Sequence, residues 1–159
     1  MSAPTLIFGW GNPSRGDDAL GPLLIERVEA LKAAHPEWGA VDLLVDFQLQ
    51  VEHALDLEGR ERVLFVDASA AAGAESFSVR RLTATRDATF TSHAMSAPSV
   101  MQVYADMMAK PPPPCALLAI GGESFELGEP LSDFAAANLG AALDWTVGWL
   151  AGDNAVLEA

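Results

Sequence analysis

Three aspartates and one histidine stand where a fold could gather them around a metal ion or a water molecule. Asp18, Asp46 and Asp67 each follow an apolar run of the kind that forms a buried strand, and His93 precedes a segment with helical periodicity. Carboxylate oxygens and imidazole nitrogens suit borderline divalent metals such as zinc or nickel. Neighbouring carboxylates also suit acid–base chemistry, because like charges raise the pKa of one of them.

Each of these residues also has a purely structural interpretation. Asp17 or Asp18 can cap the helix that follows, and Asp17 is the better candidate for capping. Asp67 ends an apolar strand, where a turn hydrogen bond would satisfy its carboxylate. His93 lies among Ser, Thr and Ala and can be an ordinary loop residue. Spacing alone therefore leaves the metal site and the structural interpretation both open.

Other catalytic chemistries have weaker support in the sequence. The loop at residues 9–18 is rich in glycine, but it matches neither a dinucleotide-binding fingerprint nor a P-loop with its lysine. No G-x-S-x-G elbow is present. Cys115 opens an apolar strand and is expected to be a small core residue. His35 and His53 are given no role, whereas Trp10 in the first loop is a candidate to line a cleft.

The order of the predicted elements would bring the candidate residues together. Strands alternate with helices, which indicates an α/β fold with a mainly parallel sheet between two helical layers. Right-handed crossovers place the carboxyl ends of the parallel strands along one edge, where α/β proteins bind ligands. Strands are predicted at 6–8, 41–45, 63–66, 77–82 and 115–120, and helices at about 20–34, 51–57, 100–107 and 132–150.

The composition describes an acidic chain that suits one domain spanning residues 1–159. Half of its residues are hydrophobic, enough for one substantial core. Nine Lys and Arg against 22 Asp and Glu give a net charge of −13, which disfavours nucleic acid and anionic lipid. The single cysteine excludes an intrachain disulfide. With no basic leader and no apolar run of ~20 residues, we expect a cytoplasmic protein that binds neither nucleic acid nor membrane.

Several short motifs occur in a fixed order along nearly the whole chain, and the first is the most specific. They are Gly11-Asn12-Pro13 followed by Gly16-Asp17-Asp18-Ala19-Leu20-Gly21, then Val66-Asp67-Ala68, Ser92-His93, and Gly121 to Ser124 continuing through Gly128 to Leu131-Ser132. On these motifs the chain resembles the hydrogenase maturation proteases. These endopeptidases remove a C-terminal extension from the large subunit of nickel–iron hydrogenases.

The resemblance implies a twisted, mainly parallel five-stranded sheet between helices and a metal site on Asp18, Asp67 and His93. It also implies that nickel belongs to the substrate: cysteines of the large-subunit precursor hold it, and the protease completes its coordination shell. Cleavage would then follow nickel insertion. The attacking water would be activated by a carboxylate, Asp18 or Asp46, or by nickel itself. Relatives lead us to expect a monomer that pairs transiently with the precursor.

The stretch from Asp46 to Gln50 departs from the commonest family pattern. Many members carry an Asp-Gly-Gly-Thr-like stretch there, whereas this chain reads Asp46-Phe47-Gln48-Leu49-Gln50. The variant is similar to the subgroup that serves NAD-linked bidirectional hydrogenases. We expect the stretch to rim the cleft and to influence the choice of precursor.

Two further functions stay open at the level of sequence. One is a non-enzymatic nickel-binding chaperone or checkpoint module that uses the same cleft. The other is a metallohydrolase that acts on small peptides or esters without a partner protein. Turnover separates the first from a protease, because an enzyme processes excess precursor and a chaperone binds it once.

Overall fold

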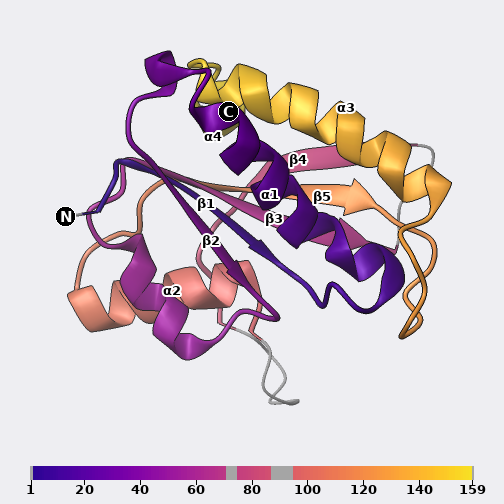
Figure 1. The fold of residues 1–159 in the computed structure, drawn as a ribbon. Helices are drawn as coiled ribbons and strands as arrows, with labels where there is room; N and C mark the ends of the chain where they lie inside the picture. Colours follow the sequence, from indigo (N-terminus) through magenta and orange to yellow (C-terminus); the bar gives the residue numbers. More distant parts are fainter. Residues whose placement is uncertain (1, 71–74, 87–94, 159) are drawn as a thin grey trace.

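Five strands form one sheet with helices on both faces in the computed structural model, which describes residues 2–70, 75–86 and 95–158 (Figure 1). The strand order is β2-β1-β3-β5-β4. Four strands run parallel, and β4 pairs antiparallel with β5 at one edge. This confirms the predicted α/β fold with a mainly parallel five-stranded sheet. The strands are β1 Thr5–Trp10, β2 Val41–Asp46, β3 Arg62–Ser69, β4 Phe77–Arg81 and β5 Cys115–Gly121.

The two faces of the sheet have separate apolar cores. Alternate residues of the strands point to opposite faces. Ile7 and Leu64 therefore pack under α1 and α3, whereas Phe8 and Phe65 pack under α2 and η3. No helix in the described part of the chain is long and apolar enough to cross a membrane. The helices are α1 Leu20–Lys32, α2 Ala97–Met108, α3 Asp133–Leu150 and α4 Ala155–Glu158, and the 3₁₀ segments are η1 Gly16–Ala19, η2 Pro36–Trp38 and η3 Val51–Leu57.

Strand β3 is longer than its apolar run predicts. The sequence places Asp67 just after the strand, but the strand continues to Ser69 because its last residues pair with β5 as far as Gly121. Asp67 is therefore held within a hydrogen-bonded ladder rather than in a loop. The prediction for Cys115 is confirmed: it is fully buried at the start of β5, and burial raises the pKa of its thiol to about 12.

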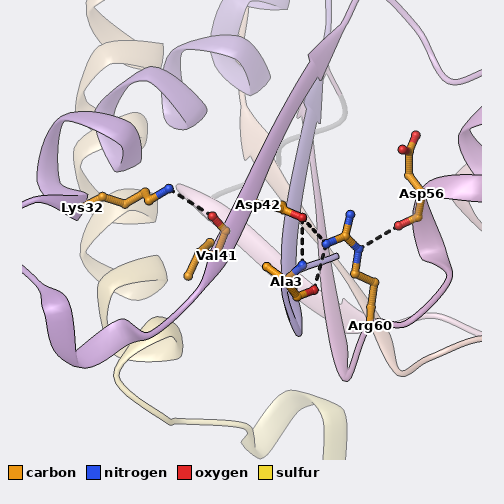
Figure 2. A network of polar contacts seen from close by, with 6 residues as sticks. All are labelled: Ala3, Lys32, Val41, Asp42, Asp56 and Arg60. Atoms are coloured by element: carbon orange, nitrogen blue, oxygen red, sulfur yellow. Dashed lines mark hydrogen bonds and ion pairs between the residues drawn. The ribbon is translucent and has the colours of Figure 1, made fainter. Parts of the chain in front are cut away.

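A polar network fixes the amino-terminal end of β2 to the rest of the molecule (Figure 2). The Arg60 guanidinium donates to the Asp42 carboxylate and to the Ala3 carbonyl oxygen, the latter at 2.8 Å. The Ala3 amide donates to the same carboxylate at 3.0 Å. These hydrogen bonds, that from Arg60 first, lower the pKa of Asp42. The network lies at the end of β2 opposite to the candidate site.

Candidate functional site

The carboxyl ends of β2, β1 and β3 place three candidate side chains in a row. Trp10 pairs with Asp46 of β2, and Gly9 pairs with Val66 of β3, so Trp10 also neighbours Asp67. All three side chains fall on the sheet face that carries η3 and α2. Because neighbouring strands lie about 4.8 Å apart, the backbones of Asp46 and Asp67 are about 10 Å apart. Asp46 is therefore separated from Asp67 by the half-buried Trp10, which the sequence named as a candidate to line a cleft.

Asp18 reaches this edge because two glycines allow the chain to turn back on itself. A Cβ atom at Gly11, where φ is +147°, would overlap the carbonyl oxygen of Asp18. A Cβ atom at Gly21 would overlap the carbonyl oxygen of Trp10 and lie 3.0 Å from that of Val66. The start of α1 thus rests directly on the ends of β1 and β3. Asp18 just precedes it, and its Oδ2 accepts a 2.6 Å hydrogen bond from the Asn12 amide.

Asp67 is a half-buried carboxylate with a strongly perturbed pKa. Its pKa is raised to about 6: burial raises it most, a 2.8 Å hydrogen bond from the Ala68 amide lowers it in part, and the negative charge of Asp18 raises it. The electrostatic effect of Asp18 means that its carboxylate lies close enough for its charge to act on Asp67. Paired carboxylates with spare lone pairs can bind a divalent cation or hold a proton.

Asp17 does not cap its own helix, contrary to the capping interpretation. It is fully buried and reaches across to the segment between β5 and α3. Its carboxylate accepts hydrogen bonds from the amides of Glu123, Ser124 and Ser132 at 2.8–3.1 Å and from the Ser132 hydroxyl at 2.7 Å. Burial by itself would raise the pKa of Asp17, but these hydrogen bonds outweigh burial and lower it. Asp17 therefore anchors a loop and leaves Asp18 as the acidic residue at the edge.

His53, to which the sequence gave no role, is buried against Phe8 and contacts Asp46. Its Nε2 lies 3.0 Å from Asp46 Oδ2, and its Nδ1 accepts a 2.8 Å hydrogen bond from the Gln50 amide. A nitrogen that accepts a hydrogen bond carries no proton, so we assign the proton to Nε2, which donates to Asp46. The Phe8 and His53 ring centroids are 4.7 Å apart in an edge-on arrangement. Histidine and carboxylate thus form a second polar pair at this edge.

A cavity of about 230 Å³ opens beside Asp46. It is lined by Gly11, Pro13, Val45, Asp46 and Phe47. Val45 and Phe47 are 51% and 67% exposed, whereas Leu49 is buried in the core. The first residues of the Asp46–Gln50 stretch therefore line a cavity, and its later part is anchored in the protein.

The third residue of the predicted metal site, His93, lies outside the described residues. Within residues 2–70, 75–86 and 95–158 no group of three or more His, Cys, Asp or Glu side chains could hold a metal ion. The described chain resumes at Met95, whose amide donates to the Leu49 carbonyl oxygen at 3.0 Å. The structure thus places Asp18 and Asp67 at the same edge of the sheet, within electrostatic reach of each other, and a metal site that they would form with His93 stays a prediction.

Comparison with known proteins identifies the fold. No protein-family model and no curated protein sequence matches the chain. Among solved structures, the [NiFe] hydrogenase maturation protease HycI from Thermococcus kodakarensis KOD1 is similar over 94% of this chain and 92% of its own, with 21% identity and a TM-score of 0.69. The hydrogenase-maturating endopeptidase HybD from E. coli is similar over 96% and 94%, with 18% identity and a TM-score of 0.73. The chain therefore has the fold of hydrogenase maturation endopeptidases over almost its entire length.

Proposed function

We propose that this protein is an endopeptidase that removes the C-terminal extension of a nickel–iron hydrogenase large-subunit precursor after nickel insertion. The observation that carries the proposal is the placement of Asp18 and Asp67, within electrostatic reach of each other, at the carboxyl edge of a sheet whose fold is shared with hydrogenase maturation endopeptidases. A partly buried carboxylate pair is costly to keep without a cationic or protonated partner, which favours a role for it in binding or chemistry.

In this proposal nickel arrives as part of the substrate. Cysteines of the precursor hold the ion, and Asp18, Asp67 and His93 complete its shell. Carboxylates and imidazole are suitable ligands for Ni²⁺. A cation beside Asp67 would favour its ionised form, so below about pH 6, where Asp67 is protonated, binding would release a proton. A precursor without nickel lacks this contact and stays uncut, which makes cleavage a checkpoint on insertion.

The hydrolysis itself needs a water molecule and a base near the scissile carbonyl. Water attacks the carbonyl carbon, a carboxylate takes its proton and returns it to the leaving amine, and the C–N bond breaks. Asp18 and Asp46 are the two candidates for that base, with nickel as the alternative means of activating the water. Asp46 is the more exposed of the two and lies beside the cavity at Phe47.

The Asp46–Gln50 stretch is our candidate for the choice of precursor, in particular for a precursor from an NAD-linked hydrogenase. Asp46 and Phe47 line the cavity and are exposed to a partner protein. Replacing the stretch by the Asp-Gly-Gly-Thr form is expected to shift preference between precursors of different hydrogenases. Unchanged preference would overturn this assignment without affecting the protease itself.

Intact mass of a large-subunit precursor, mixed with catalytic amounts of this protein, tests the proposal. We expect the C-terminal extension to be lost over many turnovers from the nickel-loaded precursor and to be kept by the nickel-free one. Stable one-to-one binding without any mass loss would instead support the nickel-binding chaperone. Hydrolysis of small peptides or esters without precursor cleavage would support the metallohydrolase.

A further inference from the structure

The outer edge of β2 carries backbone groups that the fold leaves unused. Among the described strands β2 pairs with β1 alone, and the Asp46 carbonyl oxygen accepts a 3.1 Å hydrogen bond from the Gly11 amide across that pair. In a parallel ladder alternate residues direct both N–H and C=O to the same neighbour. Asp46 therefore faces β1, and Leu43 and Val45 direct their backbone groups to the opposite side.

Among the residues that the structure describes, the side chain that reaches the backbone of this edge does so in its amino-terminal half. There, Lys32 Nζ donates to the Val41 carbonyl oxygen at 3.1 Å, and Arg60 holds the adjacent Asp42 (Figure 2). Within the described part of the chain, no hydrogen bond reaches the backbone groups that Leu43 and Val45 direct outward. Proteins usually cover or interrupt exposed strand edges, because such edges pair readily with other chains. The uncovered portion here is the portion that ends at the candidate site.

The uncovered edge is bordered by exposed apolar side chains. Val45 and Phe47 are 51% and 67% exposed, and both line the cavity of about 230 Å³ beside Asp46. An extended peptide on β2 would gain backbone hydrogen bonds from the edge and a place for one apolar side chain in the cavity. Strand addition combines these two contributions in many peptide-binding proteins.

We propose that the edge of β2 at Leu43 and Val45 binds an extended segment of the protein substrate as an added strand, with one apolar side chain in the Phe47 cavity. The inference rests on the proposed protease function and concerns how the protein binds the precursor segment next to the scissile bond. A strand added along β2 ends at the same edge of the sheet as Asp46, with Asp67 two strands further in. The net charge of −13 and the exposed Asp46 favour a neutral or basic segment over an acidic one.

The first test replaces Val45 by proline, which removes an outward N–H that the sheet does not use. Val79→Pro is the matched control: Ser76 and Leu82 pair with β5 on either side of it, and the alternation directs the Val79 backbone outward at the opposite sheet edge. When all variants are assayed with the same nickel-loaded precursor, Val45→Pro is expected to raise the KM for the precursor about tenfold with little change in kcat. Val79→Pro is expected to cleave like the wild type.

A second measurement covers the case in which Val45→Pro fails to fold. Phe47→p-benzoylphenylalanine is expected to cross-link, on illumination, to the C-terminal region of the precursor, whereas the same replacement of the exposed Met107 on α2 is not. Cross-links from position 47 to another region of the precursor would overturn the inference, as would equal cleavage by Val45→Pro and Val79→Pro. In either case, precursor cleavage by the wild type would still support the proposed protease function. Absence of both cleavage and cross-linking would overturn the protease and this inference together.

Discussion

Asp17 and Asp67 are carboxylates at the same edge of the sheet, and they differ in how many hydrogen bonds they receive. Asp17 is fully buried and accepts four, from Glu123, Ser124 and twice from Ser132, which lower its pKa in spite of its burial. From the residues that the structure describes, Asp67 accepts one, from the Ala68 amide, and its pKa is raised to about 6, chiefly by burial. Burial raises the pKa of both carboxylates, but the hydrogen bonds to Asp17 reverse the net shift there.

The difference separates a structural carboxylate from one that is available for chemistry. The two oxygens of Asp17 are occupied by donors from another part of the chain, so its charge holds the β5–α3 segment against the first loop. Within residues 2–70, 75–86 and 95–158, Asp67 has one hydrogen-bond donor, and the like charge of Asp18 acts on it. Such a pair gains most from a cation or a proton. Isosteric substitutions at the three aspartates test this distinction directly.

Asp18→Asn is expected to have the largest effect, and on activity alone. The asparagine oxygen can still accept the hydrogen bond from the Asn12 amide, so the fold is kept. If Asp18 is the proposed nickel ligand or base, loss of its negative charge is expected to lower precursor cleavage by about 1,000-fold or more, equivalent to about 4 kcal/mol. Intact mass of the precursor measures the loss of cleavage, and far-ultraviolet circular dichroism of the variant checks that the fold is kept. Full activity of Asp18→Asn would end the metal-recognition proposal.

Asp17→Asn is expected to have the reverse effect, on stability first. One carboxylate oxygen becomes an NH₂ group that faces amide or hydroxyl donors of Ser132 or Glu123, so at least one buried hydrogen bond is replaced by a clash of donors. We expect the free energy of unfolding to fall by about 2–4 kcal/mol. Urea denaturation measures it, with the exposed Asp144→Asn on α3 as the control that should change little. Equal stability of the two variants would contradict the anchoring role.

Asp67→Asn is expected to stabilise the metal-free protein at neutral and alkaline pH but not at acidic pH. The unfolded chain loses this proton near pH 3.8 and the folded chain near pH 6, so the folded state binds more protons between these values. Stability of the wild type therefore falls as pH rises through this window and stays lower above it. The variant removes that loss, giving a gain of about 1–3 kcal/mol at pH 8 and none near pH 3.5. A gain that is equal at both pH values would refute the shifted pKa.

Much of the fold was predictable because the strand and helix signals are strong. Continuous apolar runs identify the buried strands, and the segment Val51–Leu57 was predicted with the bounds it has. The end of β3 was not predictable from the sequence. Ala68 and Ser69 are small residues, and their strand conformation depends on pairing with β5 rather than on their intrinsic strand propensity. Pairing partners lie far away in the sequence, so a local pattern cannot show them.

The site was predictable at the level of strand ends and not at the level of contacts. The alternation of strands and helices places Asp18, Asp46 and Asp67 at one edge, as the structure does. Which of Asp17 and Asp18 is anchored depends on Ser132, more than a hundred residues away. The missed residue is His53, although a local signal existed: it is buried on the same side of η3 as Ala54 and Leu57, at helical spacing.

Asp46, paired with His53, can be a structural carboxylate like Asp17 or one that is available for chemistry like Asp67. Two substitutions of His53 distinguish these roles. His53→Gln can keep a donor towards Asp46 in place of Nε2–H, whereas His53→Asn can keep an acceptor for the Gln50 amide in place of Nδ1. Each variant loses one hydrogen bond, so each is expected to lose about 1 kcal/mol of stability. If Asp46 acts in hydrolysis, its orientation matters, and His53→Asn is expected to lower kcat about fivefold with His53→Gln within about twofold of the wild type. Equal kcat values for the two variants would place Asp46 with Asp17, as a carboxylate that holds structure.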